Sequence, residues 1–115
     1  MEGVAEYCQR IYEALGPGYS ERVYHNAMEV LLRRDGIAYE SERIVPIVFE
    51  EHTIGNLRSD IIVGGEVVLE FKSVKALTEP MELQARNYLK LMKLKTAYLI
   101  NFGHRDLEVR CILAE

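Results

Sequence analysis

The stretch NLRSDIIVGGEVVLEFKSV, residues 56–74, sets charged side chains beside and inside two apolar runs. Asp60 precedes the first run, and Glu70 and Lys72 lie within the second. Burial of an unpaired charge is costly, so a segment that only filled a core would carry aliphatic residues at these positions. These charged groups are therefore either exposed to solvent or functional.

The two runs, residues 53–63 and 66–74, flank a Gly-Gly pair and predict a β-hairpin. Side chains alternate along the second run, which places Glu70 and Lys72 on one face together with Val68. The opposite face carries only apolar side chains, Val67, Leu69 and Phe71. The acid and the base therefore point the same way from the predicted sheet.

The register of the hairpin decides which residues face this pair. With a three-residue loop over residues 64–66, Val63 pairs with Val67, Asp60 lies opposite Glu70, and Arg58 lies opposite Lys72. A two-residue loop would place the two carboxylates on opposite faces instead. The prediction of a carboxylate pair therefore depends on the longer loop.

Two carboxylates on directly opposed strand positions repel each other unless a cation or a proton lies between them. A divalent metal resolves the repulsion, and oxygen ligands suit Mg²⁺ or Mn²⁺, which take only one or two carboxylates from a protein. Lys72 would then lie beside the metal, where it could position a water or stabilise charge on a phosphate.

A structural alternative uses the same four side chains without a metal. Asp60, Glu70, Arg58 and Lys72 could form a ladder of ion pairs across a solvated sheet face, and alternation taken alone favours this ladder.

The rest of the chain predicts the order α, α, β, β, β, α, β, β. Apolar spacing predicts a first helix over residues 4–15, ended by Gly16-Pro17-Gly18, and a second helix capped by Ser20 and ended at Gly36. A β-branched run over residues 37–49 predicts a strand, with Pro46 marking an edge or a bulge. Thr78 begins a third helix that continues to Leu94, and two strands follow.

Two further polar residues stand near the predicted site. Glu21 falls in the first turn of the second helix, where interaction with the helix dipole is a sufficient structural reason for an acid. Gln84 interrupts the apolar stripe of the third helix, and its amide needs hydrogen-bond partners if that face is buried. A satisfied amide at the edge of the core is the structural alternative for Gln84.

Composition limits the classes of protein that fit. The chain of 115 residues, 49% hydrophobic and 28% charged, fits one compact domain over residues 1–115. Its longest apolar run is too short to cross a bilayer and its N-terminus is unlike a signal peptide, so we expect a soluble, cytoplasmic protein without membrane contact. The net charge of −4 argues against nonspecific coating of nucleic acid.

Several other residues have structural interpretations. Cys8 and Cys111 share no spacing with the histidines, and both are predicted to be small core residues. Tyr24 is interpreted as a core aromatic residue, in preference to a phosphate or base contact. His25, His52 and His104 have no spacing typical of metal ligands, so no role is assigned to them.

Several motifs together resemble a known family. Asp60 followed by Glu70 and Lys72 in EFK resembles the D…ExK core of the PD-(D/E)XK nuclease superfamily. GYSERVY, with Gly18, Glu21 and Tyr24, is similar to the signature of its GxxExxY branch, and ELQARNYLK and LINFG resemble later segments of that branch. Ser59 stands where the superfamily name expects proline.

The resemblance implies an α/β (α+β) fold of the restriction-endonuclease type. Its αβββαβ core, a mixed central sheet flanked by helices, would span residues 20–102, with an extra N-terminal helix and a C-terminal strand.

The resemblance also implies roles for individual residues. Asp60, Glu70 and the backbone carbonyl of Phe71 would ligate Mg²⁺ or Mn²⁺, and Lys72 would serve the attacking water. Glu21 would complete the acidic cluster, and Gln84 would face the site from the third helix.

These observations lead to a metal-dependent nuclease as the principal hypothesis, with DNA favoured over RNA. Lys75, Arg86 and Lys90 are candidate nucleic-acid contacts. A chain this small has little surface to hold a duplex, so a homodimer or a larger protein partner is expected. The alternative is an inactive nuclease fold that binds nucleic acid or a protein partner, and the acidic net charge favours that alternative.

Overall fold

The computed structural model describes residues 3–103 and 105–115, so His104 lies outside the described residues. Three helices and seven strands follow one another: α1 Val4–Leu15, α2 Glu21–Arg34, β1 Tyr39–Ser41, β2 Ile44–Phe49, β3 His52–Arg58, β4 Ile61–Val63, β5 Val67–Lys72, α3 Glu79–Met92, β6 Thr96–Asn101 and β7 Glu108–Leu113. None of these helices, within the described ranges, is long and apolar enough to cross a membrane.

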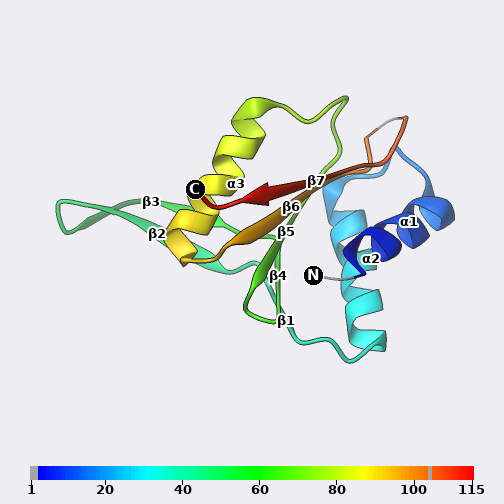
Figure 1. The fold of residues 1–115 in the computed structure, drawn as a ribbon, viewed down its shortest axis with the longest axis horizontal. Helices are drawn as coiled ribbons and strands as arrows, with labels where there is room; N and C mark the ends of the chain where they lie inside the picture. The colour runs from blue at the N-terminus through cyan, green and yellow to red at the C-terminus, as the bar shows by residue number, and fades with distance from the viewer. Residues whose placement is uncertain (1–2, 104) are drawn as a thin grey trace.

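A five-stranded mixed sheet in the order β1-β4-β5-β6-β7 forms the centre of the fold. Strands β5 and β6 run parallel because α3 connects them, and the other neighbouring pairs are antiparallel. Helices α1 and α2 cover one face of this sheet and α3 covers the other (Figure 1). The predicted α+β fold, with helices on both sides of a mixed sheet, is confirmed.

The predicted hairpin register is also confirmed. Val63 pairs with Val67 and Ile61 with Leu69, so residues 64–66 form the three-residue loop. Gly64 and Gly65 both adopt positive φ, 59° and 69°, a conformation that glycine reaches without a steric penalty. One pair beyond Ile61 and Leu69, this register brings Asp60 to Glu70.

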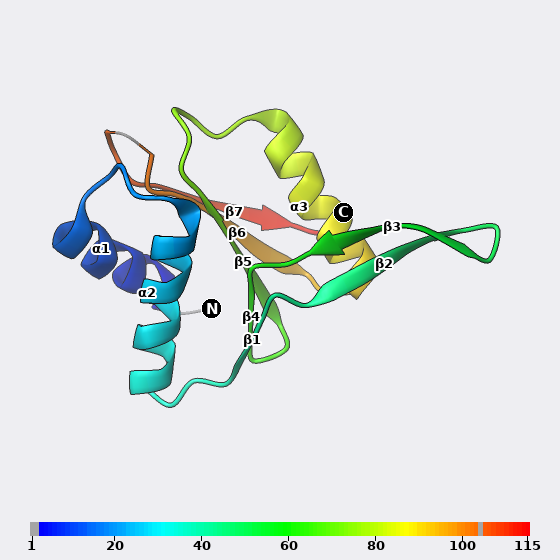
Figure 2. The same cartoon turned by 180° about the vertical axis from the view of Figure 1, so that it is seen from behind.

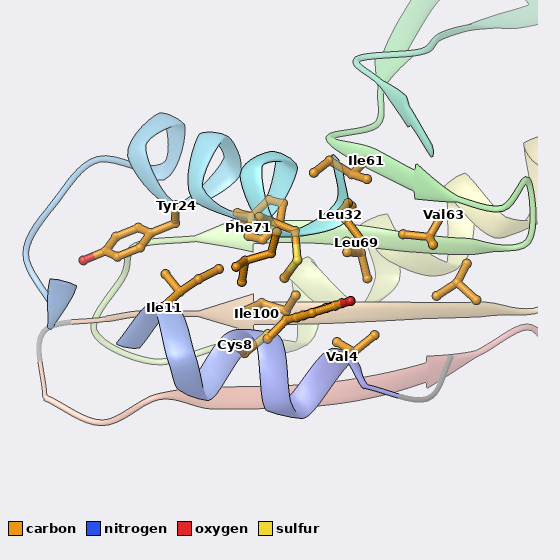
Figure 3. Close-up of a cluster of buried hydrophobic side chains, with 14 of the residues drawn as sticks. Val4, Cys8, Ile11, Tyr24, Leu32, Ile61, Val63, Leu69, Phe71 and Ile100 are labelled. Atoms are coloured by element: carbon orange, nitrogen blue, oxygen red, sulfur yellow. The ribbon is translucent and has the colours of Figure 1, made fainter. Parts of the chain in front are cut away.

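The two faces of the sheet carry separate apolar clusters. Val67, Leu69 and Phe71 pack under α1 and α2, where Cys8, Leu32 and Ile100 also lie (Figure 3). Val68 packs under α3 with Ala85 and Leu89. Glu70 shares the face of Val68, as the alternation predicted, and therefore lies on the α3 side of the sheet.

The structure differs from the prediction in the strands before β4. The two runs over residues 37–49 and 53–63 were each expected to form one strand. Each instead forms two strands, because both runs bend away from the main sheet at neighbouring positions. Beyond the bend, β2 and β3 pair as a two-stranded arm that projects from the body (Figure 2). A β-bulge interrupts the arm between Ile47 and Val48, next to Pro46, as predicted.

The bend corrects one part of the predicted register. Arg58 pairs with Ile44 in the arm and not with Lys72 in the main sheet. Backbone hydrogen bonds hold the crossing: the Ser59 N–H donates to the Arg43 carbonyl at 3.0 Å, and the Glu42 N–H donates to the Asp60 carbonyl at 2.9 Å. The ion-pair ladder of these four side chains is therefore wrong, since Arg58 belongs to a different sheet.

Two smaller predictions meet different outcomes. Cys8 is buried, but Cys111 is exposed on the edge strand β7, so its assignment to the core is wrong. Edge-strand residues alternate between covered and uncovered faces, and Cys111 points to the uncovered one. The third helix also ends at Met92, two residues earlier than expected.

Candidate active site

A buried carboxylate lies at the centre of the site. Glu70 is only 5% exposed, and among the described residues its Oε1 has no hydrogen-bond partner. Buried polar groups in proteins are nearly always paired, so an orphaned carboxylate oxygen indicates an absent partner. Burial, and next the adjacent charge of Asp60, raise the pKa of Glu70 well above its ordinary value of 4.5, and the charge of Lys72 acts in the opposite direction.

Asp60 faces Glu70 from the residue immediately before β4. Its Oδ2 accepts a hydrogen bond of 2.8 Å from the backbone N–H of Phe71. This bond fixes the Asp60 carboxylate at the edge of β5, beyond the last pair of the β4–β5 ladder. Because the chain bends at Ser59 and Asp60, the Asp60 side chain points toward the neighbouring strand β5.

The backbone carbonyl of Phe71 faces the same edge. The next carbonyl, that of Lys72, accepts a hydrogen bond of 3.1 Å from the Phe102 N–H on the opposite side of the strand. The N–H and the C=O of one strand residue point to the same edge of the strand, and those of the next residue point to the opposite edge. The Phe71 carbonyl therefore lies on the edge where its N–H meets Asp60.

Lys72 is half-buried at the last position of β5 and pairs with Asn101 of β6. Alternation puts its side chain on the face of Glu70. The following loop is fixed by Asn101, whose side chain accepts from the Val74 N–H at 3.0 Å and donates to the Val74 carbonyl at 2.9 Å. Lys75 comes next and lines a hollow with Arg105 and Asp106, at the same end of the sheet.

Tyr88 of α3, a member of the apolar stripe that Gln84 interrupts in the sequence, is a neighbour of the site. Its hydroxyl donates to the backbone carbonyl of Arg58, two residues before Asp60. Burial, followed by the negative charge of Glu70, raises the pKa of Tyr88 to about 12. A tyrosine in a buried stripe needs a partner for its hydroxyl, which is the signal that could have revealed this contact.

Arg22 of α2 was also not predicted. It forms an ion pair with Glu42, whose backbone N–H holds the Asp60 carbonyl. This contact places a guanidinium near the bend that carries Asp60, and no local motif could have signalled it.

The other predicted acidic ligand stays apart. Glu21 is exposed at the first position of α2. In the described ranges, no group of three or more His, Cys, Asp and Glu side chains is arranged to hold a metal. The structure brings Asp60 and Glu70 together without Glu21.

Gln84 is exposed on α3, one turn before Tyr88. It lines a shallow hollow with Leu57 of β3 and Asn87 of α3. This position lies between the arm and the helix, on the side of the sheet that carries Glu70.

The basic residues predicted to contact nucleic acid divide between the two ends of the sheet. Arg86 and Lys90 line a hollow with Ala114 and Glu115. The Ala114 N–H donates to the Lys95 carbonyl, where β6 begins, whereas Lys72 and Lys75 lie where the parallel strand β5 ends. Only Lys75 of the three lies at the end of the sheet that carries Lys72.

Tyr24 is a core residue, as interpreted from the sequence. Its ring stacks on Phe102 with a centroid separation of 4.0 Å, and its hydroxyl donates to the Gly16 carbonyl at 2.6 Å. It lies within the apolar cluster under α1 and α2 (Figure 3).

The donor set at the pair fits a hard divalent cation. Two carboxylates and one backbone carbonyl supply only oxygen ligands, and the orphaned Oε1 of Glu70 offers a free acceptor. Mg²⁺ accepts one or two carboxylates and keeps several waters, so a third acid is not required. When bound, such an ion polarises a phosphoryl oxygen and lowers the pKa of water.

Comparison with solved structures supports the fold. The chain is similar to a solved structure described as "Crystal structure of SSO0001", with a TM-score of 0.64 and 18% identity. The likeness covers 81% of this chain, and this chain spans only 49% of that one. No match was found among curated proteins.

A family model described as the PD-(D/E)XK nuclease superfamily matches residues 1–112. Nucleases of this superfamily generally use divalent metals and bind nucleic acid. The chain therefore belongs to the PD-(D/E)XK nuclease superfamily.

Proposed function

We propose that this protein is a metal-dependent nuclease of the GxxExxY branch that hydrolyses phosphodiester bonds, with DNA as its substrate. The observation that carries the proposal is the orphaned, buried carboxylate of Glu70 beside Asp60. A binding module has no need of two acids that repel each other and repel phosphate.

Each residue has a defined role in the proposed reaction. Asp60, Glu70 and the Phe71 carbonyl hold Mg²⁺ or Mn²⁺, and the Phe71 N–H keeps Asp60 oriented toward it. Lys72 orients the attacking water and stabilises negative charge as it builds on the phosphate. Gln84 faces the substrate from α3, and Glu21 adds negative charge from the first position of α2 without ligating the metal.

The substrate approaches across the end of the sheet where β5 ends. Lys75 contacts a phosphate there, beside Lys72, whereas Arg86 and Lys90 contact the backbone farther along α3. The chain, one domain over residues 1–115, acts as a homodimer or with a larger protein partner, because its own surface is small for a duplex.

Cleavage of labelled single-stranded and double-stranded DNA and RNA in Mg²⁺, Mn²⁺ or EDTA tests this proposal. We expect cutting of DNA that requires the metal and is lost in Asp60→Ala and in Lys72→Ala. Arg10→Ala is the matched control, since Arg10 is exposed on α1, on the far side of the sheet from α3. Equal cutting by all variants would contradict the assignment, and metal binding without cutting would favour an inactive binding module.

A further inference from the structure

The arm formed by β2 and β3 carries an uncovered apolar surface. Four large hydrophobic side chains on it are more than half exposed: Ile44 58%, Val48 59%, Phe49 62% and Ile54 64%. The tip of the arm projects away from the helices and the main sheet in both views (Figures 1 and 2). An isolated two-stranded ribbon is only marginally stable in water, so exposed apolar residues on it indicate a surface that contacts another chain.

The tip of the arm has an unusual turn. Phe49 pairs with His52, so Glu50 and Glu51 alone form the two-residue loop. Both adopt positive φ, 49° and 68°, in a turn that normally selects Asn-Gly. The left-handed region costs about 1–2 kcal/mol for a residue with a side chain. Two acids kept in strained positions indicate that their charge at the tip has a use.

A surface of complementary character lies on the body of the same chain. Lys93 and Lys95 flank a hollow of about 500 Å³, a volume typical of binding pockets. The remaining lining residues are Glu66, Val67, Leu94 and Thr96. Within the described part of the chain, neither Lys93 nor Lys95 forms an ion pair, and neither do Glu50 and Glu51.

We propose that the tip of the arm docks into this hollow on a second copy of the chain. Phe49 covers the apolar floor at Val67 and Leu94, and the two acids of the tip meet Lys93 and Lys95. The contact is reciprocal: each arm binds the hollow of the other copy. The two copies are then related by a two-fold axis and form a closed dimer. The acidic tip disfavours nucleic acid as the occupant, because phosphates would be repelled.

Exchange of charges between the two surfaces tests this contact. One variant combines Glu50→Lys with Glu51→Lys, and a second combines Lys93→Glu with Lys95→Glu. Each variant alone opposes like charges, so we expect its dimer dissociation constant to rise about tenfold or more in sedimentation equilibrium. An equimolar mixture of the two variants restores both attractive contacts and should form a heterodimer with nearly wild-type affinity.

The control variant combines Glu6→Lys with Glu13→Lys on the exposed side of α1, and it should dimerise like wild type. Circular dichroism checks that each variant is folded. A monomeric wild-type protein would overturn the inference, as would a dimer that tolerates both reversals or a mixture that stays monomeric. These measurements do not depend on cleavage of nucleic acid. The dimer contact and the proposed nuclease activity can therefore be confirmed or contradicted independently.

Discussion

Glu70→Gln should make the metal-free protein more stable at neutral pH. Glutamine keeps the shape of the side chain but removes the charge that burial and Asp60 disfavour. Because the folded state raises the pKa of Glu70, it binds the proton more tightly than the unfolded chain does. The wild-type stability is therefore full below the ordinary pKa of 4.5 and falls as the pH rises toward the raised value in the folded state.

The size of this penalty has an upper bound. Neutral pH lies about 2.5 pH units above the ordinary pKa of 4.5, and each unit corresponds to about 1.4 kcal/mol. The raised pKa of Glu70 therefore lowers the free energy of unfolding at pH 7 by at most about 3–4 kcal/mol. We expect Glu70→Gln to recover about 1–3 kcal/mol at pH 7 and almost none at pH 4.

Urea unfolding in EDTA, followed by circular dichroism from pH 4 to pH 8, measures this difference. Adding Mn²⁺ at 100 times its dissociation constant should stabilise the wild type by about 2.7 kcal/mol and leave Glu70→Gln unchanged. Glu13→Gln, an exposed acid of α1, is the control. A variant that is less stable than wild type at pH 7, with the same difference at pH 4, would refute the reasoning.

Three further predictions concern the neighbours of the site and the two thiols. Tyr88→Phe removes the hydrogen bond to the Arg58 carbonyl, so it should cost about 1 kcal/mol in urea unfolding and weaken Mn²⁺ binding in calorimetry; unchanged stability would contradict the contact. Ser59→Pro supplies the proline of the superfamily name but removes the N–H bonded to the Arg43 carbonyl, so it should destabilise the fold by about 1–3 kcal/mol, and a gain in stability would argue against the bend. Burial raises the pKa of Cys8 to about 12, so a thiol reagent should label only the exposed Cys111 in the folded protein and both thiols in denaturant; rapid labelling of Cys8 would contradict its burial.

Local sequence signals predict the parts of this fold that depend on neighbouring residues. The Gly64-Gly65 turn and the alternation after it determine which strand residues face each other, and the carboxylate pair follows from that register. Helices α1, α2 and α3 follow from apolar spacing and from the glycines and prolines at their ends. These signals act over a few residues and need no tertiary information.

The bend between the arm and the main sheet could not be predicted in this way. It depends on Glu42 at φ 58° and on hydrogen bonds between residues about 16 positions apart in the chain, such as Ser59 and Arg43. Side chains alternate in the same way along a bent strand and along a continuous one. The alternation therefore could not show that Arg58 pairs in the arm and not in the main sheet. The contact of Tyr88 with the Arg58 carbonyl depends on the bend as well.

Isothermal titration of the metal-free protein with Mn²⁺ tests the central claim most directly. We expect one ion per chain in the wild type, with binding abolished in both Asp60→Asn and Glu70→Gln and retained in Glu13→Gln. Absence of binding in the wild type, or undiminished binding in the two site variants, would contradict a metal site at the Asp60 and Glu70 carboxylates.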